Sequence, residues 1–253
     1  MPHNLRIVPV LLLVACGTFV PDPSGPGGPP PSQPEWLVPF RLGSTGLEEG
    51  RAIAALTDAV VVASWFSGTV DFDPGEATTA RTSFGAQDLA VARYSTGGEF
   101  GWLFSFGGTG ADVPSAIAST ADGGVVVAGY SAGGGTCSGR TLQSLGGRDV
   151  LVLKLNADGL CEWAHLLGGS GDDEARAVAA APDGSVAIVG SFSGTADFDP
   201  TGGAALLVSR GGADGFLARF TASGDFIDVA QAGGQQDDVL NAVSIAAGGD
   251  VTV

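Results

Sequence analysis

The sequence has few positive charges. Its 253 residues contain 11 Lys and Arg against 27 Asp and Glu, which gives a formal net charge of −16. A chain this acidic lacks the basic surface with which proteins bind nucleic acid, so no nucleic-acid partner is expected. No apolar run reaches the roughly 18 residues needed to span a bilayer. The hydrophobic content of 44% nevertheless exceeds that of disordered chains and indicates a folded protein.

Residues that commonly carry catalysis are also scarce. The chain has two histidines and three cysteines. His165 occupies a strand position at which Phe104 stands one repeat earlier, which predicts a packed side chain rather than a catalytic base. No Ser/His/Asp or Cys/His set can be assembled, and a zinc site built from His and Cys is excluded. We therefore predict no catalytic residue.

The first sixteen residues have the features of an export signal. Arg6 supplies a positive charge, and the nine apolar residues from Ile7 to Ala15 are too few for a membrane span but suit a signal peptide. The segment Leu13-Val14-Ala15-Cys16 resembles a bacterial lipobox. That resemblance implies removal of residues 1–15, attachment of a lipid to Cys16, and a membrane partner through that lipid. An ordinary signal peptide or a buried strand containing Cys16 is the alternative.

The residue after Cys16 is glycine rather than aspartate, which by the same resemblance favours the outer membrane or cell surface. Residues 16–35 then form a linker, because seven of the eighteen residues from Gly17 to Pro34 are proline and four are glycine. Such a segment cannot bury a core and is typical of a partly stiff tether.

An internal repeat organises residues 36–253. The opening GGTGAD at Gly107 returns as GGSGDD at Gly168, and the later halves of the units bring Asp88, Asp149 and Asp214 into register at spacings of 61 and 65 residues. The units are approximately 36–101, 102–162 and 163–227, with 228–253 as a partial fourth. Repeats of this length indicate one supersecondary unit stacked on copies of itself.

Each unit contains four short strand candidates, several of them joined by Asp-Gly turns. The runs VVVAG and VLVLKL are nearly continuous in apolar residues, as expected when both faces of a sheet are covered. The fold class predicted is all-β, a beta-propeller of four-stranded antiparallel blades. About three and a half blades are present, which suggests an incomplete or truncated propeller, and closure by oligomerisation is the alternative.

The pattern resembles the SBBP repeat of bacterial beta-propeller proteins. The residues that carry this resemblance are the GG-x-G-x-D openings, the D-G-x-V-x-V-x-G hairpins, and the segments FSGTVDFDP and FSGTADFDP. The resemblance implies a propeller, often with seven blades, and no common catalytic chemistry. The second unit departs from it, because SAGGGTCSGRTLQS replaces the DFDP segment.

The longer loops are expected at one end of the blades and the short turns at the other. The long loops carry 16 acidic and 6 basic residues, so this end should favour cations. These loops are residues 43–51, 69–88, 107–115, 131–149, 168–176, 194–214 and 233–241. Asp71 and Asp73, repeated as Asp197 and Asp199, are candidate calcium ligands because Ca²⁺ prefers carboxylate oxygens. The alternative for all four is an Asx-type turn that proline ends.

Cys137 and Cys161 both belong to the second unit, and an envelope compartment would let them form a disulfide. Strand order places them at opposite ends of the blade, so a bond requires the long loop to fold down the outer edge. We expect a lipid-anchored envelope protein that binds an unknown protein or glycan. A carbohydrate-active hydrolase or lyase that uses loop carboxylates remains the alternative.

Overall fold

The structure is a computed structural model that describes residues 47–253. These residues form strands and loops and no helix, so the all-β prediction is confirmed for them. The predicted signal peptide, the lipidation site Cys16, the linker 16–35 and the beginning of the first unit lie outside the described residues.

The described chain folds into three consecutive units of four antiparallel strands, here called the first, second and third units. The first unit is a separate four-stranded sheet, whereas two residue pairs, Gly168 with Asp197 and Gly169 with Ala196, join the second and third units into one eight-stranded sheet. Within each unit the strands lie side by side in chain order. The first unit comprises β1 (Leu47–Ala55), β2 (Ala59–Ser67), β5 (Asp88–Ser95) and β6 (Phe100–Phe106). The second comprises β7 (Asp112–Ser119), β8 (Val125–Ser131), β11 (Asp149–Leu155) and β12 (Cys161–Gly169). The third comprises β13 (Glu174–Ala180), β14 (Val186–Asp197), β15 (Leu206–Phe220) and β16 (Phe226–Ala232).

Three small hairpins accompany these sheets. They are β3 (Thr69–Asp71) with β4 (Ala80–Thr82), β9 (Gly135–Cys137) with β10 (Arg140–Leu142), and β17 (Ser244–Ile245) with β18 (Val251–Thr252). Trp102 and Trp163 lie in the last strand of their sheets. The sheets therefore divide at 107–111 and 170–173, a few residues after the repeat boundaries expected from sequence.

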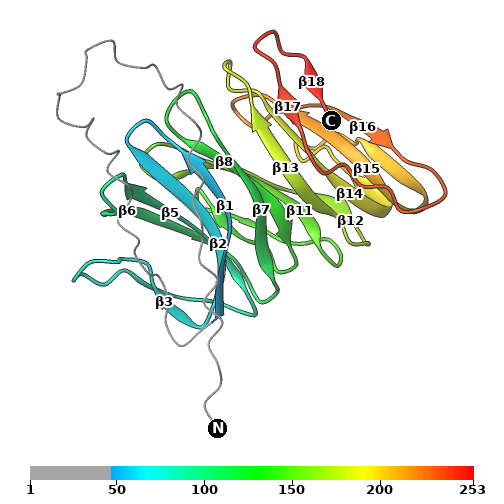
Figure 1. Ribbon diagram of the computed structural model, residues 1–253. Helices are drawn as coiled ribbons and strands as arrows, with labels where there is room; N and C mark the ends of the chain where they lie inside the picture. Colours follow the sequence, from blue (N-terminus) through cyan, green and yellow to red (C-terminus); the bar gives the residue numbers. More distant parts are fainter. Residues whose placement is uncertain (1–46) are drawn as a thin grey trace, which may run out of the picture. The chain divides into compact units, whose positions relative to one another are not determined.

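The second unit is covered on both faces, as the continuous apolar runs predict. All seven residues of β11 are buried. Leu151, Leu153 and Leu155 join a hydrophobic core shared with the first unit, whereas Val150 and Val152 join a core shared with the third. Successive side chains of a strand point to opposite faces, so the first and second units each contribute to two cores. Figure 1 shows the three sheets following one another from blue through green to orange.

Candidate functional site

The described loops sort into two classes by position. In an antiparallel sheet of four strands, the connection between the second and third strands and the connection to the next sheet leave from the same end. The segments at this end, called the long-loop end, are 68–87, 107–111, 132–148, 170–173, 198–205 and 233–243. The opposite end, called the short-turn end, carries the tight turns within each sheet.

The DFDP segments form the same loop in the first and third units. Asp71 Oδ1 accepts the backbone N–H groups of Asp73, at 3.1 Å, and Thr79, at 2.8 Å. Asp197 Oδ1 accepts the N–H groups of the residues two and eight positions later, at 3.1 and 2.9 Å. This is an Asx-type arrangement in which the carboxylate closes its own loop.

The second aspartate of each segment also accepts backbone hydrogen bonds. Asp73 Oδ1 accepts the N–H of Gly75 at 2.8 Å, and Asp199 Oδ1 accepts that of Thr201 at 2.8 Å. A cation bound to these loops would have to avoid the amide hydrogens that point at the Oδ1 atoms. Among residues 47–253, no three His, Cys, Asp or Glu side chains converge as a metal site. Calcium at these four carboxylates stays a prediction.

The phenylalanine between the two aspartates anchors each loop in the core. Phe72 and Phe198 are buried. Phe72 packs edge-on against Phe66 with ring centroids 5.3 Å apart, and Phe198 packs the same way against Phe192 at 5.5 Å. The Tyr94 hydroxyl also donates to the Phe72 carbonyl at 3.0 Å. Each of these loops is therefore held by a buried ring as well as by a carboxylate.

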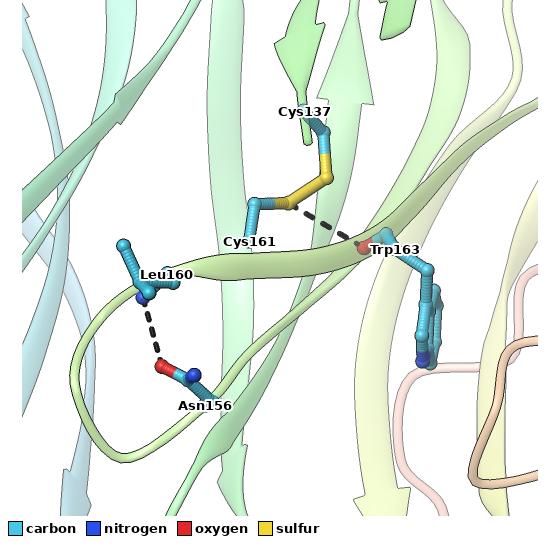
Figure 2. Close-up of a disulfide and its surroundings, with 5 residues drawn as sticks. All are labelled: Cys137, Asn156, Leu160, Cys161 and Trp163. Carbon is cyan, nitrogen blue, oxygen red and sulfur yellow. Dashed lines mark hydrogen bonds between the residues drawn. A yellow bond between two sulfur atoms is a disulfide. The ribbon is translucent and has the colours of Figure 1, made fainter. Parts of the chain in front are cut away.

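The second unit anchors its loop through a disulfide. Cys137 at the end of β9 is bonded to Cys161 at the start of β12, with Cα atoms 5.5 Å apart. The β9–β10 hairpin folds down the sheet, which removes the separation that strand order alone implies. Figure 2 shows the bond beside the turn in which Asn156 accepts the backbone N–H of Leu160, at 2.9 Å.

Two aspartates lie close together at each junction between units on the long-loop end, and all of them except the half-buried Asp238 are buried. The aspartate that begins β5 or β11, or lies within β15, accepts the backbone N–H of the residue four positions earlier. These bonds run from Phe84 to Asp88, from Leu145 to Asp149 and from Arg210 to Asp214. The aspartate of the following unit accepts the N–H of a glycine four positions earlier, as Gly108 donates to Asp112 and Gly169 to Asp173, both at 2.9 Å.

A backbone hydrogen bond joins the two aspartates of each junction. The N–H groups of Asp112, Asp173 and Asp238 donate at 2.7 Å to the carbonyls of Gln87, Arg148 and Ala213, the residues just before the partner aspartates. The glycine in between has no room for a side chain. A β-carbon at Gly168 would lie 2.4 Å from Asp173 Oδ2 and 2.5 Å from Asp149 Oδ1.

Burial raises the pKa of three of the junction carboxyl groups, those of Asp88, Asp112 and Asp173. It raises the pKa of Asp112 and that of Asp173 to about 6 each, against hydrogen bonds that lower them. The charges of Asp88 and Asp149 raise these two pKa values further. Burial raises the pKa of Asp88 as well. One oxygen of Asp88 and one of Asp149 are buried without a hydrogen-bond partner.

Two tryptophans connect neighbouring units at the short-turn end. Trp102 Nε1 donates to the carbonyl of Ala157 at 2.9 Å, and Trp163 Nε1 donates to that of Ala222 at 3.0 Å. Each acceptor belongs to the last turn of the following unit. Gly159 is required there, because it has φ of +77° and a β-carbon would lie 2.4 Å from the Trp102 ring. These indoles have structural roles.

His165 is packed in the same region, as its strand position predicts. Its Nε2 lies 2.7 Å from the Gly224 carbonyl, and its ring stacks on that of Trp163, at a centroid distance of 5.4 Å, and on that of Phe220, at 5.7 Å. Burial lowers the pKa of His165. The imidazole is therefore neutral near pH 7, and Nε2 is the nitrogen that carries the proton.

A hollow of about 420 Å³ also lies at the short-turn end, between the first and second units. Its lining includes Asp58, Arg93, Ser119 and Thr120. Arg93 donates to both carboxylate oxygens of Asp58 at 3.0 Å, so its charge is already paired. Sequence reasoning missed this hollow, because it forms where turns of two different units meet.

Comparisons with known proteins leave the family open. No protein-family model and no curated protein matches the sequence. Within the described residues, no helix has both the length and the apolar character needed to cross a membrane. The SBBP resemblance therefore rests on the motifs of the sequence itself.

The junction carboxyl groups predict a specific dependence of stability on pH. Because the pKa values of Asp112 and Asp173 rise from 3.8 to about 6 on folding, the folded state keeps protons that the unfolded state releases. The stabilisation is complete below pH 4 and is lost as the pH rises through 6. Each group should contribute of the order of 1 to 3 kcal/mol to the free energy of unfolding across this range.

Urea unfolding at pH 4.5, 5.5, 6.5 and 7.5 measures this dependence. We expect the free energy of unfolding to fall with pH in the wild type and to change less in the double variant Asp112→Asn/Asp173→Asn. Asp158→Asn is the matched control, since Asp158 is exposed at a short turn. An equally steep decline in the double variant would contradict the assignment.

The calcium prediction for the DFDP loops is checked by thermal melting. If the four carboxylates bind Ca²⁺, millimolar Ca²⁺ should raise the melting temperature of the wild type, and a chelator should reverse the rise. The variant Asp73→Asn/Asp199→Asn should show no rise. A wild-type melting curve that is identical with calcium and with chelator would remove calcium and leave the Asx-type loop.

Proposed function

We propose that this protein is a lipid-anchored β-propeller of the cell envelope that acts as a binding or protein-interaction module. The ligand would be a protein or a glycan, and the binding face would be the long-loop end. The observation that carries the proposal is the repetition of one scaffold with different loops. Three similar sheets present an Asp-capped loop, a disulfide-linked hairpin and a second Asp-capped loop at the same end.

The propeller arrangement is supported by the way the sheets bury one another. A single antiparallel sheet can leave one face in water, but β8 and β11 are buried along their length on both faces. The contacts between units repeat: a pair of aspartates at one end and, where present, a tryptophan at the other. Repeating the same step between sheets is how propellers arrange their blades.

The disulfide supports a location in the cell envelope. Disulfides persist in oxidising compartments and are rare in the cytosol. The Cys137–Cys161 bond lies in the second unit, far along the chain from the signal-like segment that ends at Cys16. Two separate features of the chain therefore agree on export from the cytosol.

The binding role is supported by a difference between the two ends of the units. At the short-turn end, the same packing recurs between units, since the Trp102 and Trp163 indoles and the turns they contact fit closely. At the long-loop end, the loop bases are fixed by buried aspartates while the loops themselves differ between units. Binding residues are often found on loops that a rigid scaffold positions.

The anchor predicts lipid incorporation at Cys16. Cells that produce the full chain are grown with an alkyne-tagged fatty acid, and the purified protein is assayed for the tag. The wild type should carry the label and should sediment with membranes, whereas Cys16→Ala should be unlabelled and released. Cys137→Ala keeps Cys16 and should be labelled like the wild type. An unlabelled wild type would contradict lipid attachment.

The binding face predicts where substitutions affect ligand capture. The soluble Cys16→Ala chain is screened against arrays of glycans and of basic peptides, because the long-loop end is acidic. Asp73→Asn/Asp199→Asn should lower the affinity for the captured ligand at least about tenfold, and Asp158→Asn at the short-turn end should not lower it. Loss of binding in Asp158→Asn alone would move the face to the other end. Release of reducing sugar from a captured glycan would instead indicate the hydrolase or lyase.

A further inference from the structure

Cys137 occupies a position that belongs to phenylalanine in the other two units. Strand register identifies it: Phe66, Ser131 and Phe192 pair with the three aligned aspartates of the first, second and third units. Six residues later in each unit come Phe72, Cys137 and Phe198. The cysteine therefore stands where the other loops place the buried ring that anchors them.

Cys161 also occupies a phenylalanine position. It pairs with Leu155 across β11 and β12, as Phe100 pairs with Tyr94 in the first unit and Phe226 with Phe220 in the third. These aromatic pairs pack edge-on, with centroids 6.1 Å apart in both units. In the second unit a covalent bond replaces the aromatic contacts on both sides.

The carboxylate anchor is missing from the second unit as well. The register that aligns Cys137 with Phe72 places Thr136 and Ser138 where Asp71 and Asp73 stand in the first unit. The noncovalent attachments that remain are few and small. Gly135 packs closely on the Phe106 ring, where a β-carbon would lie 2.8 Å away, and Leu142 is partly buried against the core shared with the first unit.

We propose that the Cys137–Cys161 disulfide is a redox-dependent anchor that fixes the β9–β10 hairpin on the long-loop end, while the two corresponding loops stay fixed whatever the redox state. The proposal adds regulation to the binding face of the proposed function. It concerns the order of one loop, so it can be tested without any ligand. Its failure would leave the binding proposal standing.

Reduction follows ordinary thiol–disulfide exchange with a dithiol. A thiolate of the dithiol attacks the Sγ of Cys161, which is the less buried of the two residues, forms a mixed disulfide and releases Cys137 as a thiolate that takes up a proton. The second thiol of the reagent then displaces Cys161, which leaves as a thiol. The protein gains two electrons and two protons, and the dithiol is oxidised to its own disulfide.

The chain contains matched protease sites that report on this loop. Arg140 lies in β10 of the second unit and Arg81 lies in β4 of the first, both exposed in the second strand of a small hairpin. The folded protein is reduced with dithiothreitol, alkylated, freed of reagent and digested with trypsin under native conditions. The fragments are then denatured and reduced before mass analysis, so that the disulfide does not hide a cut at Arg140.

Reduction and alkylation should accelerate cleavage after Arg140 by about tenfold or more and change cleavage after Arg81 less than about twofold, because local opening exposes the backbone to the protease. Cys137→Ala/Cys161→Ala should be cleaved rapidly after Arg140 without reduction and should not respond to it. Equal protection of Arg140 in the oxidised and reduced proteins would overturn the proposal. Equal acceleration at both arginines would also overturn it, since that result indicates global unfolding.

Hydrogen exchange on the wild type provides a second measurement that needs no variant. Amides of residues 135–142 should exchange faster after reduction, while those of 69–82 should not. Alkylation is located peptide by peptide, so that Cys137 and Cys161 are distinguished from Cys16. Faster exchange throughout the second unit, including β11, would contradict a change confined to the hairpin.

Discussion

Coverage of both faces of every inner sheet is the constraint on which the rest of this structure depends. Because β11 alternates between two cores, its leucines belong to one neighbour and its valines to the other. All seven residues of β11 are buried, so this strand has no exposed face left for a site. A buried lysine illustrates the rule: Lys154 extends to the short-turn end, where Asp122 and Glu162 neutralise it at 2.6 and 2.9 Å.

The two ends solve different problems with the remaining residues. The long-loop end must hold irregular backbone above a packed sheet, and buried aspartates do this by accepting N–H groups that would otherwise lack partners. The short-turn end must keep neighbouring sheets in register, and the indoles do this by reaching across to the next unit. At the long-loop end, this arrangement also places carboxyl groups close enough to repel one another when they are charged.

Much of the strand pattern could be predicted from the sequence, because each run has a local signature. VLVLKL, the Asp-Gly turns and the aligned Asp88, Asp149 and Asp214 all indicate repeated antiparallel strands. The pairing of Asp149 with Asp173 and the acceptors of the Trp102 and Trp163 indoles could not be predicted this way, and the disulfide could be named from the sequence only as a candidate. Each depends on which residues face one another across units or down an edge. Strand register was the missing signal, since it aligns Cys137 with Phe72.

The hydrogen bonds from the Trp102 and Trp163 indoles to the next unit have a consequence for how the chain can be divided. Trp163 is covered by Ala222 and Gly224, which belong to a sheet that begins after it. If the protein were cut between the second and third units, the N-terminal fragment would therefore expose the Trp163 indole to water. In the C-terminal fragment, the turn that contains Ala222 would lose its indole partner. The repeats look independent along the chain. A fragment in which the indole of every unit is covered would nevertheless have to include the last turn of the following unit.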